Sequence, residues 1–327
     1  MEFDLIERIR RRVVVRGDVV LGIGDDAAVL ALPPGRQLVV AMDTLNAGVH
    51  FPVGTPAADI GWKALAVNLS DLAAMGATPA WCTLSLSMPE ADPHWLDDFL
   101  DGFSMLAATH DVALVGGDTT RGPLSVCVTV HGFVEPGRAL RRDGARAGDD
   151  VWVSGTPGDA AAGLVLAGIP VPGIDRIDAS DEDRAALASR LARPQPRVAL
   201  GVALSGIANA GIDISDGLLA DAAHIARASG VTLRIDVDAL PASAALARCV
   251  DTDTRRVLQA TGGDDYELLL TAPASARDAI DAMSRECGVS VARIGQAVAG
   301  GGVQAVDADG RDWCPARAGY QHFADRR

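Results

Sequence analysis

Several apolar runs in this chain lead into an aspartate, either directly or through one or two glycines or another short step. Leu38–Met42 and Val112–Val115 are two such runs, each short and rich in residues that favour strands. The acids that follow such runs are Asp43, Asp118, Asp213 and Asp216, and Asp264 and Asp265 come directly after two glycines and before a further strand-like run. The pattern predicts buried strands whose ends form acidic corners.

Segments with helical periodicity alternate with these strands. Residues 58–75 place apolar side chains at helical spacing, and Gly76 suits the position just after a helix end. Asn68 and Asp71 lie three residues apart on this helix, so we expect them on one face. Further helices are expected at residues 94–109, 159–167, 181–191, 218–228 and 276–287. The alternation predicts a mixed α/β fold.

A polar, glycine-containing stretch from Arg142 to Asp149 separates the two halves of the chain. The length of 327 residues also fits about two domains. We therefore predict an N-terminal domain of residues 1–148 and a C-terminal domain of residues 149–327.

The charge balance excludes several classes of protein. The chain has 43 acidic and 29 basic residues, for a net charge of −14, and Lys63 is its only lysine. Nucleic-acid binding needs clustered cations, and a P-loop needs a lysine after glycine, which Lys63 does not provide. Because Lys63 follows Asp59 by four residues on a helix, we expect it to be a surface ion-pair partner.

The chain shows no sign of secretion or membrane insertion. Its longest uncharged apolar stretch, residues 160–174, is interrupted by glycine and proline, and the N-terminus resembles an amphipathic helix with early acids. The five cysteines are far apart and form no C-x-x-C pair, so neither a zinc site nor a disulfide framework is expected. Cys82 and Cys127 are expected in the core. A reducing cytoplasm is the expected compartment.

A glycine motif near the N-terminus needs a separate interpretation. Gly22-Ile-Gly-Asp-Asp-Ala27 matches the dinucleotide pattern G-x-G-x-x-A, which requires a following helix to hold pyrophosphate. Strand-forming residues and a double proline follow instead. The sequence therefore does not favour a Rossmann domain.

Metal binding explains the acidic corners better than turn formation alone. Two like charges 4 Å apart repel by about 4 kcal/mol at an effective dielectric constant near 20, so clustered carboxylates require cations. Hard oxygen ligands select Mg²⁺, which keeps its remaining positions for water and phosphate oxygens. Glycine corners such as Gly116-Gly117 and Gly262-Gly263 would also let backbone N–H groups approach phosphate.

These motifs closely resemble those of thiamine-monophosphate kinase, in the family's order and over nearly the whole chain. They are Gly22–Asp26, Met42–Thr44 with His50-Phe51, Ala66–Gly76, Gly116–Arg121, Asp213–Gly217, Gly262–Leu268 and Gly319–Phe323. The resemblance implies a two-domain fold of the aminoimidazole ribonucleotide synthetase type, a homodimer, and γ-phosphoryl transfer from ATP to thiamine phosphate. Nucleic acid and membrane are not expected partners.

The resemblance also implies roles for individual residues. Mg²⁺ ions would be bound by Asp26, Met42, Asp43, Asp71, Asp118, Asp213 and Asp216. ATP would be contacted by Gly117, Asp118, Arg142 and Ser215, and thiamine phosphate by His50, Asp264 and Tyr320. Family members often have serine or threonine where this chain has Ala41 and Met42, so a metal contact there would have to come from the backbone carbonyl.

The proposed chemistry needs no catalytic acid or base. The nucleophile would be a phosphate oxygen, already largely ionised at neutral pH, and the barrier is the approach of two anions. Alternatives remain at single positions: His50 and Tyr320 could be structural, and Arg142 could form a salt bridge. At the level of function, the rivals are a related enzyme that activates a carbonyl or amide oxygen with ATP and a non-enzymatic protein that binds divalent cations.

Overall fold

The chain forms two compact units in a computed structural model that describes residues 2–320. The first unit comprises the residues up to Leu72 together with Ala77–Arg138. The second comprises Ala73–Gly76 and the chain from Ala139 onward. The two units divide after Arg138, ten residues before the predicted boundary at residue 148. The predicted domains, residues 1–148 and 149–327, stay a prediction.

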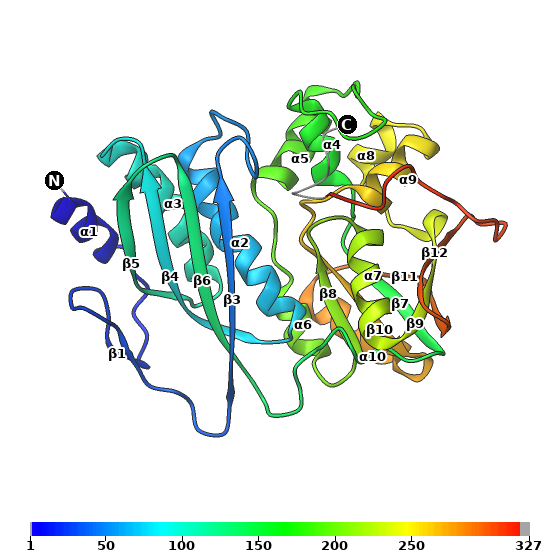
Figure 1. The fold of residues 1–327 in the computed structure, drawn as a ribbon, viewed down its shortest axis with the longest axis horizontal. Coiled ribbons are helices and arrows are strands. Elements are labelled where there is room, and N and C mark those ends of the chain that lie inside the picture. Colours follow the sequence, from blue (N-terminus) through cyan, green and yellow to red (C-terminus); the bar gives the residue numbers. More distant parts are fainter. Residues whose placement is uncertain (1, 321–327) are drawn as a thin grey trace. The chain divides into compact units, whose positions relative to one another are not determined.

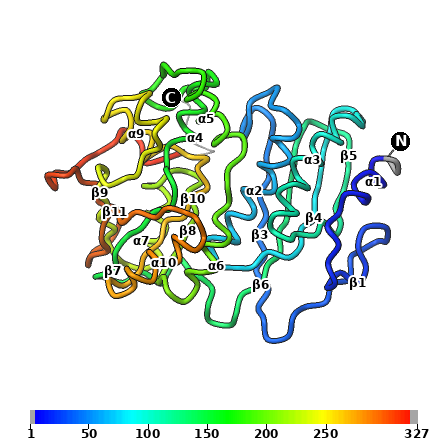
Figure 2. Tube along the Cα trace, turned by 180° about the vertical axis from the view of Figure 1, so that it is seen from behind, coloured from blue at the N-terminus to red at the C-terminus, as the bar shows by residue number. Residues whose placement is uncertain are grey.

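The first unit is built on a four-stranded sheet. Its strand order is β3 (Gln37–Asn46), β6 (Ser125–Val134), β4 (Thr78–Met88) and β5 (Ala113–Arg121). β4 and β5 are parallel, and the other pairs are antiparallel. The helices α2 (Ala57–Ala74) and α3 (Pro93–Thr109) cover one face of this sheet (Figures 1 and 2).

Two glycines let these helices pack closely. A Cβ on Gly102 of α3 would lie 1.8 Å from the carbonyl oxygen of Ala58, and one on Gly61 of α2 would lie 2.0 Å from the carbonyl oxygen of Phe99. Because no larger residue fits, the two backbones approach directly. This contact leaves α2 buried along most of its length.

The short strands β1 (Val19–Leu21) and β2 (Val29–Leu30) pair with each other. Val19 and Leu30 pack against a core cluster that includes Trp81 and Phe133, whose rings meet edge to face at 5.0 Å. A strand, β2, therefore follows the Gly22–Ala27 motif where a dinucleotide-binding site would need a helix. This confirms the interpretation that the motif does not form a Rossmann domain.

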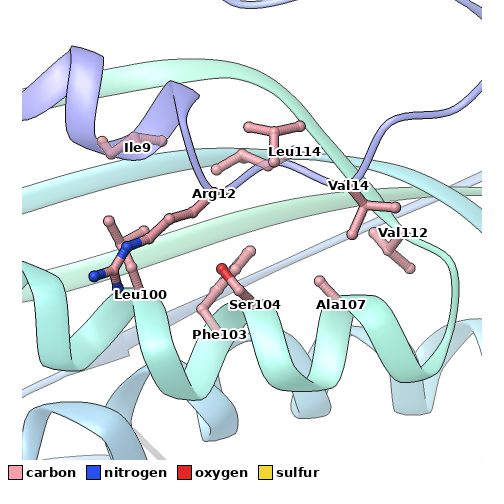
Figure 3. A pocket seen from close by; sticks show the side chains of 10 residues that line it. Ile9, Arg12, Val14, Leu100, Phe103, Ser104, Ala107, Val112 and Leu114 are labelled. Carbon is pink, nitrogen blue, oxygen red and sulfur yellow. The ribbon is translucent and has the colours of Figure 1, made fainter.

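The N-terminal helix α1 (Glu2–Arg10) belongs to the first unit and packs on α3. Ile9 and Arg12 lie over α3 beside Phe103 and Ser104 (Figure 3). Arg12 also pairs with Asp101 at 2.6 Å. The cavity left at this contact measures about 10 Å³, which is room for one water at most. The contact is therefore structural.

The second unit contains a six-stranded sheet. Its order is β12 (Gly302–Val306), β9 (Val231–Asp236), β11 (Val291–Ala299), β7 (Asp149–Ser154), β10 (Glu267–Pro273) and β8 (Ala210–Ile214). β12 and β9 are parallel, and the remaining pairs are antiparallel. The main core lies where α7 (Leu218–Ser229) packs on this sheet.

The remaining helices of the second unit are mostly short. They are α4 (Asp159–Leu166), α5 (Asp181–Ala192), α6 (Val198–Leu204), α8 (Ala244–Cys249), α9 (Thr252–Thr261) and α10 (Arg277–Cys287), with 3₁₀ turns η1 (Val237–Ala239) and η2 (Ala274–Ala276). A second core joins α4, α5, α8 and α9 through residues such as Leu187, Leu246 and Leu258.

The mixed α/β class is confirmed, and every predicted helix is present within a few residues of its expected bounds. Cys82 is fully buried as predicted, whereas Cys127 is only half-buried. All five cysteines are free in the structure. Among the described residues, no helix is both long enough and apolar enough to cross a membrane.

Candidate active site

In the second unit, the candidate residues other than Arg142 lie around one turn, Ser215–Gly217, between β8 and α7. β8 ends at Ile214, and α7 begins at Leu218. The side chain of Asp221, in the first turn of α7, accepts hydrogen bonds of 3.1 Å from the backbone N–H groups of Ser215, Asp216 and Gly217. A single carboxylate thus sets the path of the chain through the predicted ATP and metal ligands.

The loop that carries Asp264 packs directly against this turn. The Asp264 N–H donates to the Ser215 carbonyl at 2.9 Å, and a Cβ on Gly263 would lie 2.5 Å from that same oxygen. Asp264 and Tyr266 both have positive φ, 69° and 52°, which non-glycine residues rarely adopt. Such backbone strain is concentrated at functional sites.

The C-terminal segment reaches the same turn. The Tyr320 N–H donates to the Asp216 carbonyl at 2.8 Å, and a Cβ on Gly319 would lie 2.5 Å from that oxygen. The Tyr320 side chain is half-exposed. The rest of the predicted Gly319–Phe323 motif lies outside the described residues. Asp213, Ser215, Asp216, Asp264 and Tyr320 are therefore grouped around one turn.

The electrostatics of this turn favour a cation. Burial, followed by the negative charges of Asp213 and Asp216, raises the pKa of Asp221 to about 7. Burial is the larger cause of this shift, and the charges of Asp213 and Asp216, which are candidate metal ligands, add to it. Hard carboxylate oxygens of this kind match the ligand preference of Mg²⁺.

Asp265 has a different role from its neighbour Asp264. Its carboxylate is buried and accepts a 2.7 Å hydrogen bond from the N–H of Gly158, at the start of α4. Burial raises the pKa of Asp265 well above its usual range. Of the two adjacent acids, Asp265 therefore anchors the loop to the protein interior and is not an exposed ligand.

Glu267 is the centre of a buried ion network behind this loop. It accepts hydrogen bonds from Arg190 at 2.6 Å and from Arg197 at 2.5 and 2.6 Å. Burial favours the neutral acid, but the hydrogen bonds and charge of Arg197 prevail and lower the pKa of Glu267. The two arginines line a cavity of about 360 Å³ that also contains Asp159. Glu267 and Asp159 offset the positive charge there, so the cavity does not present a net positive site.

In the first unit, Asn68 connects α2 to β3. Its Oδ1 accepts a 2.8 Å hydrogen bond from the Asp43 N–H, and its Nδ2 donates to the Ala64 carbonyl at 2.9 Å. Asp71 lies one helical turn beyond Asn68 on the same face. Asn68 therefore turns this part of α2 toward β3 at Asp43.

Asp118 lies on the opposite edge of the same sheet. Across the sheet, Asp43 pairs with Val128, Val128 with Leu84, and Leu84 with Gly117. Gly117 is the residue before Asp118. Three strand spacings separate β3 from β5, or about 14 Å. One metal ion cannot bridge that distance within this sheet, so Asp43 and Asp118 would require different ions.

The glycine corners differ in what surrounds them. A Cβ on Gly117 would lie 1.8 Å from the Leu84 carbonyl oxygen, and one on Gly262 would lie 2.4 Å from the Ala161 Cβ. Gly116, in contrast, has no atom within 4 Å of its Cβ position. Close packing of the protein itself therefore accounts for Gly117, Gly262 and Gly263, and only Gly116 is open.

Asp26 and Met42 occupy exposed positions in the first unit. Asp26 lies in the β1–β2 connection, where its N–H donates to the Asp25 carboxylate at 2.8 Å. Met42 is paired with Thr129 in the sheet and is 61% exposed. Across residues 2–320, no three or more His, Cys, Asp or Glu side chains converge tightly enough to hold a metal alone.

His50 lies in a tight loop after β3. Its Nδ1 accepts a 3.0 Å hydrogen bond from the Asn46 N–H, and its backbone carbonyl accepts one of 3.1 Å from the ammonium of Lys63. Lys63 is only 2% exposed. The prediction that Lys63 lies on the surface was therefore wrong, because α2 is buried on nearly every side. Its pairing with Asp59 stays a prediction.

Arg142 does not lie beside the Ser215 turn. The neighbouring Arg141 lies at the N-terminal end of β8, where the Arg141 carbonyl accepts a hydrogen bond from the Gly211 N–H. Ser215 follows the C-terminal end of the same strand. Four residues of strand separate these points by roughly 13 Å. The Arg142 side chain is exposed.

Asp221 and Lys63 are the residues that sequence reasoning missed. Asp221 had one usable signal, since an acid in the first turn of a helix often binds backbone N–H groups there. For Lys63 the sequence offered no such signal. Its spacing of four residues from Asp59 places both residues on one face of α2 but does not show whether that face of the helix is exposed.

Two family descriptions match this chain. "AIR synthase related protein, N-terminal domain" matches residues 24–134, and "AIR synthase related protein, C-terminal domain" matches residues 146–308. Fold and site thus define a two-domain protein of the AIR synthase-related class.

Individual relatives narrow this class. The thiamine-monophosphate kinase of Salmonella typhimurium is 47% identical over 332 residues, covering 99% of this chain and 98% of the relative. The crystal structure of thiamine-monophosphate kinase from Stenotrophomonas maltophilia K279a is 53% identical with a TM-score of 0.86, covering 95% of this chain and 98% of that one. The chain belongs to the thiamine-monophosphate kinase family.

A further solved structure is informative about ligands. The protein named AaThiL, complexed with AMPPCP and TMP, is 32% identical with a TM-score of 0.74. The likeness covers 98% of this chain and 97% of that one.

Proposed function

We propose that this chain transfers the γ-phosphoryl group of ATP to thiamine phosphate and so forms thiamine diphosphate. The observation that carries the proposal is its full-length likeness to thiamine-monophosphate kinases, at 47% identity over 99% of the chain. The AMPPCP and TMP bound by AaThiL support ATP and thiamine phosphate as the substrates. The related enzymes that activate carbonyl or amide oxygens are the alternative within the superfamily.

Magnesium is the metal that this donor set fits. The candidates are Asp26, Met42 through its carbonyl, Asp43, Asp71, Asp118, Asp213 and Asp216. Among the described residues of each unit, no three such acids form a tight cluster, so each ion would be held by one or two carboxylates and would complete its coordination with water and phosphate. That is the usual mode of Mg²⁺ binding with phosphate substrates. When bound, the ions would neutralise charge on the phosphoryl oxygens.

The protein side chains would bind and orient the two substrates. Gly117, Asp118, Arg142 and Ser215 are the proposed ATP contacts, and His50, Asp264 and Tyr320 the proposed thiamine phosphate contacts. The acceptor phosphate is already an anion at neutral pH, so no residue has to remove a proton from it. The chain would contribute positioning, with the two phosphates held in line.

The first unit supports a homodimer. Leu38, Val40 and Met42 alternate along β3 and are 46%, 54% and 61% exposed. Within residues 2–320, β3 pairs only with β6, so its other edge is also available. An exposed apolar face on an edge strand favours association.

Analytical ultracentrifugation should show a dimer for the wild type and a monomer for Val40→Asp, whereas Ile169→Asp should remain dimeric.

The decisive experiment is product analysis. The purified protein is incubated with ATP, Mg²⁺ and thiamine phosphate, and thiamine diphosphate is measured by chromatography. Formation of thiamine diphosphate with one ADP per product supports the proposal. ADP release that depends on a different acceptor, without thiamine diphosphate, would support the alternative enzyme class.

Cytoplasm is the proposed compartment, since ATP is available there.

A further inference from the structure

The only lysine of the chain lies inside the first unit and contacts a backbone carbonyl. Lys63 is 2% exposed, and its ammonium donates to the carbonyl oxygen of His50 at 3.1 Å. An ammonium group loses much solvation free energy on burial, so its hydrogen bonds must compensate for that loss. A charge-assisted hydrogen bond of this kind is roughly twice as strong as a neutral one.

The loop that ends at His50 is held at several other points. The Val49 and His50 N–H groups donate to the Asn46 carbonyl at 3.1 and 3.0 Å, and the Gly48 N–H donates to the Phe51 carbonyl at 2.9 Å. Phe51 is 4% exposed and anchors the far side of the loop. Lys63 thus adds a side-chain contact from α2 to a loop that these backbone hydrogen bonds also hold.

The imidazole of His50 is oriented by the same loop. Its Nδ1 accepts from the Asn46 N–H at 3.0 Å, so this nitrogen carries no proton. In the neutral ring the proton must then be on Nε2. A ring in this state presents an N–H donor at Nε2, which suits a phosphate oxygen.

We propose that Lys63 is a positioning residue for substrate binding, which fixes the His50 loop so that the imidazole donates to thiamine phosphate through Nε2. The inference rests on the proposed function for the identity of the ligand. The geometry that it requires, from Asn46 through His50 to Lys63, lies entirely within the first unit.

Kinetics of two Lys63 variants provide the first test. Lys63→Met keeps the length of the side chain but removes its donors, and it should raise the KM for thiamine phosphate about tenfold or more while the KM for ATP stays within about twofold. Lys63→Arg restores a cation with donors and should recover part of the affinity. Leu65→Ala, two positions further on the same buried helix, should lower stability without changing either KM.

Magnetic resonance provides a test that does not depend on activity. With one lysine in the chain, ¹³C-labelled lysine gives a single side-chain signal, and we expect thiamine phosphate to shift it in the wild type but not in His50→Gln. Long-range ¹H–¹⁵N spectra should show His50 protonated at Nε2 in the wild type and a mixture of tautomers in Lys63→Met.

The outcomes separate the two proposals. If the wild type forms no thiamine diphosphate, the proposed function is wrong, whatever the spectra show. If the wild type forms it and folded Lys63→Met keeps the wild-type KM for thiamine phosphate, only the role of Lys63 is overturned. A His50 ring protonated at Nδ1 in the wild type would overturn that role as well.

Discussion

The carboxylate of Asp221 accepts a 3.1 Å hydrogen bond from the backbone N–H of Gly217. The same oxygen also accepts from Ser215 and Asp216, so one atom holds three successive amides. This arrangement fixes the backbone at Ser215 and Asp216, and Asp221 itself is only 3% exposed. The Ser215–Gly217 turn, which carries proposed metal and ATP ligands, therefore depends on the buried carboxylate of Asp221.

Removing the acceptor at position 221 should destabilise the second unit. Asp221→Ala leaves buried N–H groups without a partner, at about 1–3 kcal/mol for each group left unsatisfied. Asp221→Asn keeps an oxygen acceptor and removes the repulsion from Asp213 and Asp216. Urea denaturation should therefore rank Asp221→Ala well below Asp221→Asn, and equal stabilities would contradict the role assigned to this carboxylate.

The proposed metal ligands should affect turnover much more than folding. Asp71→Asn and Asp216→Asn each remove a charged oxygen ligand, and we expect kcat to fall by about tenfold to a hundredfold or more. Circular dichroism and thermal melts should stay close to those of the wild type. Asp98→Asn, at an exposed position on α3, is the matched control and should keep full activity. Wild-type turnover of either variant at saturating Mg²⁺ would remove that residue from the metal site.

The Asp264 loop should tolerate no side chain at Gly263. An added Cβ would lie 2.5 Å from the Ser215 carbonyl oxygen, so Gly263→Ala must displace the loop or the turn. We expect a higher KM for thiamine phosphate together with a lower melting temperature. Gly301→Ala has no atom within 4 Å of its Cβ and should change neither. An unchanged KM in Gly263→Ala would mean that this contact does not position the substrate loop.

Asp265 should make stability depend on pH. Burial raises its folded-state pKa well above the ordinary value of 3.8, so the folded protein holds this proton more tightly than the unfolded chain. The resulting stabilisation is fully present below about pH 3.8 and is lost as pH rises through the folded-state pKa, at up to about 1.4 kcal/mol per pH unit. Asp265→Asn cannot ionise, so its stability relative to wild type should increase from pH 5 to pH 8. A difference that stays constant over this range would show that Asp265 does not titrate as its burial implies.

The parts of the fold that follow from local pattern were predictable, and those that depend on tertiary contacts were not. The long apolar periodicity of residues 58–75 was sufficient to predict α2. β11 and β12 were missed because Gly295 interrupts β11, β12 has only five residues and begins at Gly302, and the alternation of both is weak. Short helices such as α6 and α8 carry too few residues for a periodic signal.

The same limit applies to the candidate site. The grouping of Asp213, Ser215 and Asp216 follows from their adjacency at a strand end, as the sequence indicated. Asp264 and Asp265 are also adjacent, yet Asp265 is buried and bonded to Gly158 while Asp264 packs on the Ser215 turn. Which of two neighbouring acids turns inward is decided by packing and backbone conformation, and neither is visible in residue spacing.

The end of α2 has a consequence for dividing the chain. Ala73–Gly76 belongs to the second unit, although the rest of that helix belongs to the first. A Cβ on Gly201 would lie 2.0 Å from the Ala73 carbonyl oxygen, so these four residues fill a space that α6 leaves for them. A fragment that starts at Ala139 would lack this piece and expose the groove around Gly201. A C-terminal half expressed by itself should therefore lack part of its core, and only a chain that carries Ala73–Gly76 can supply it.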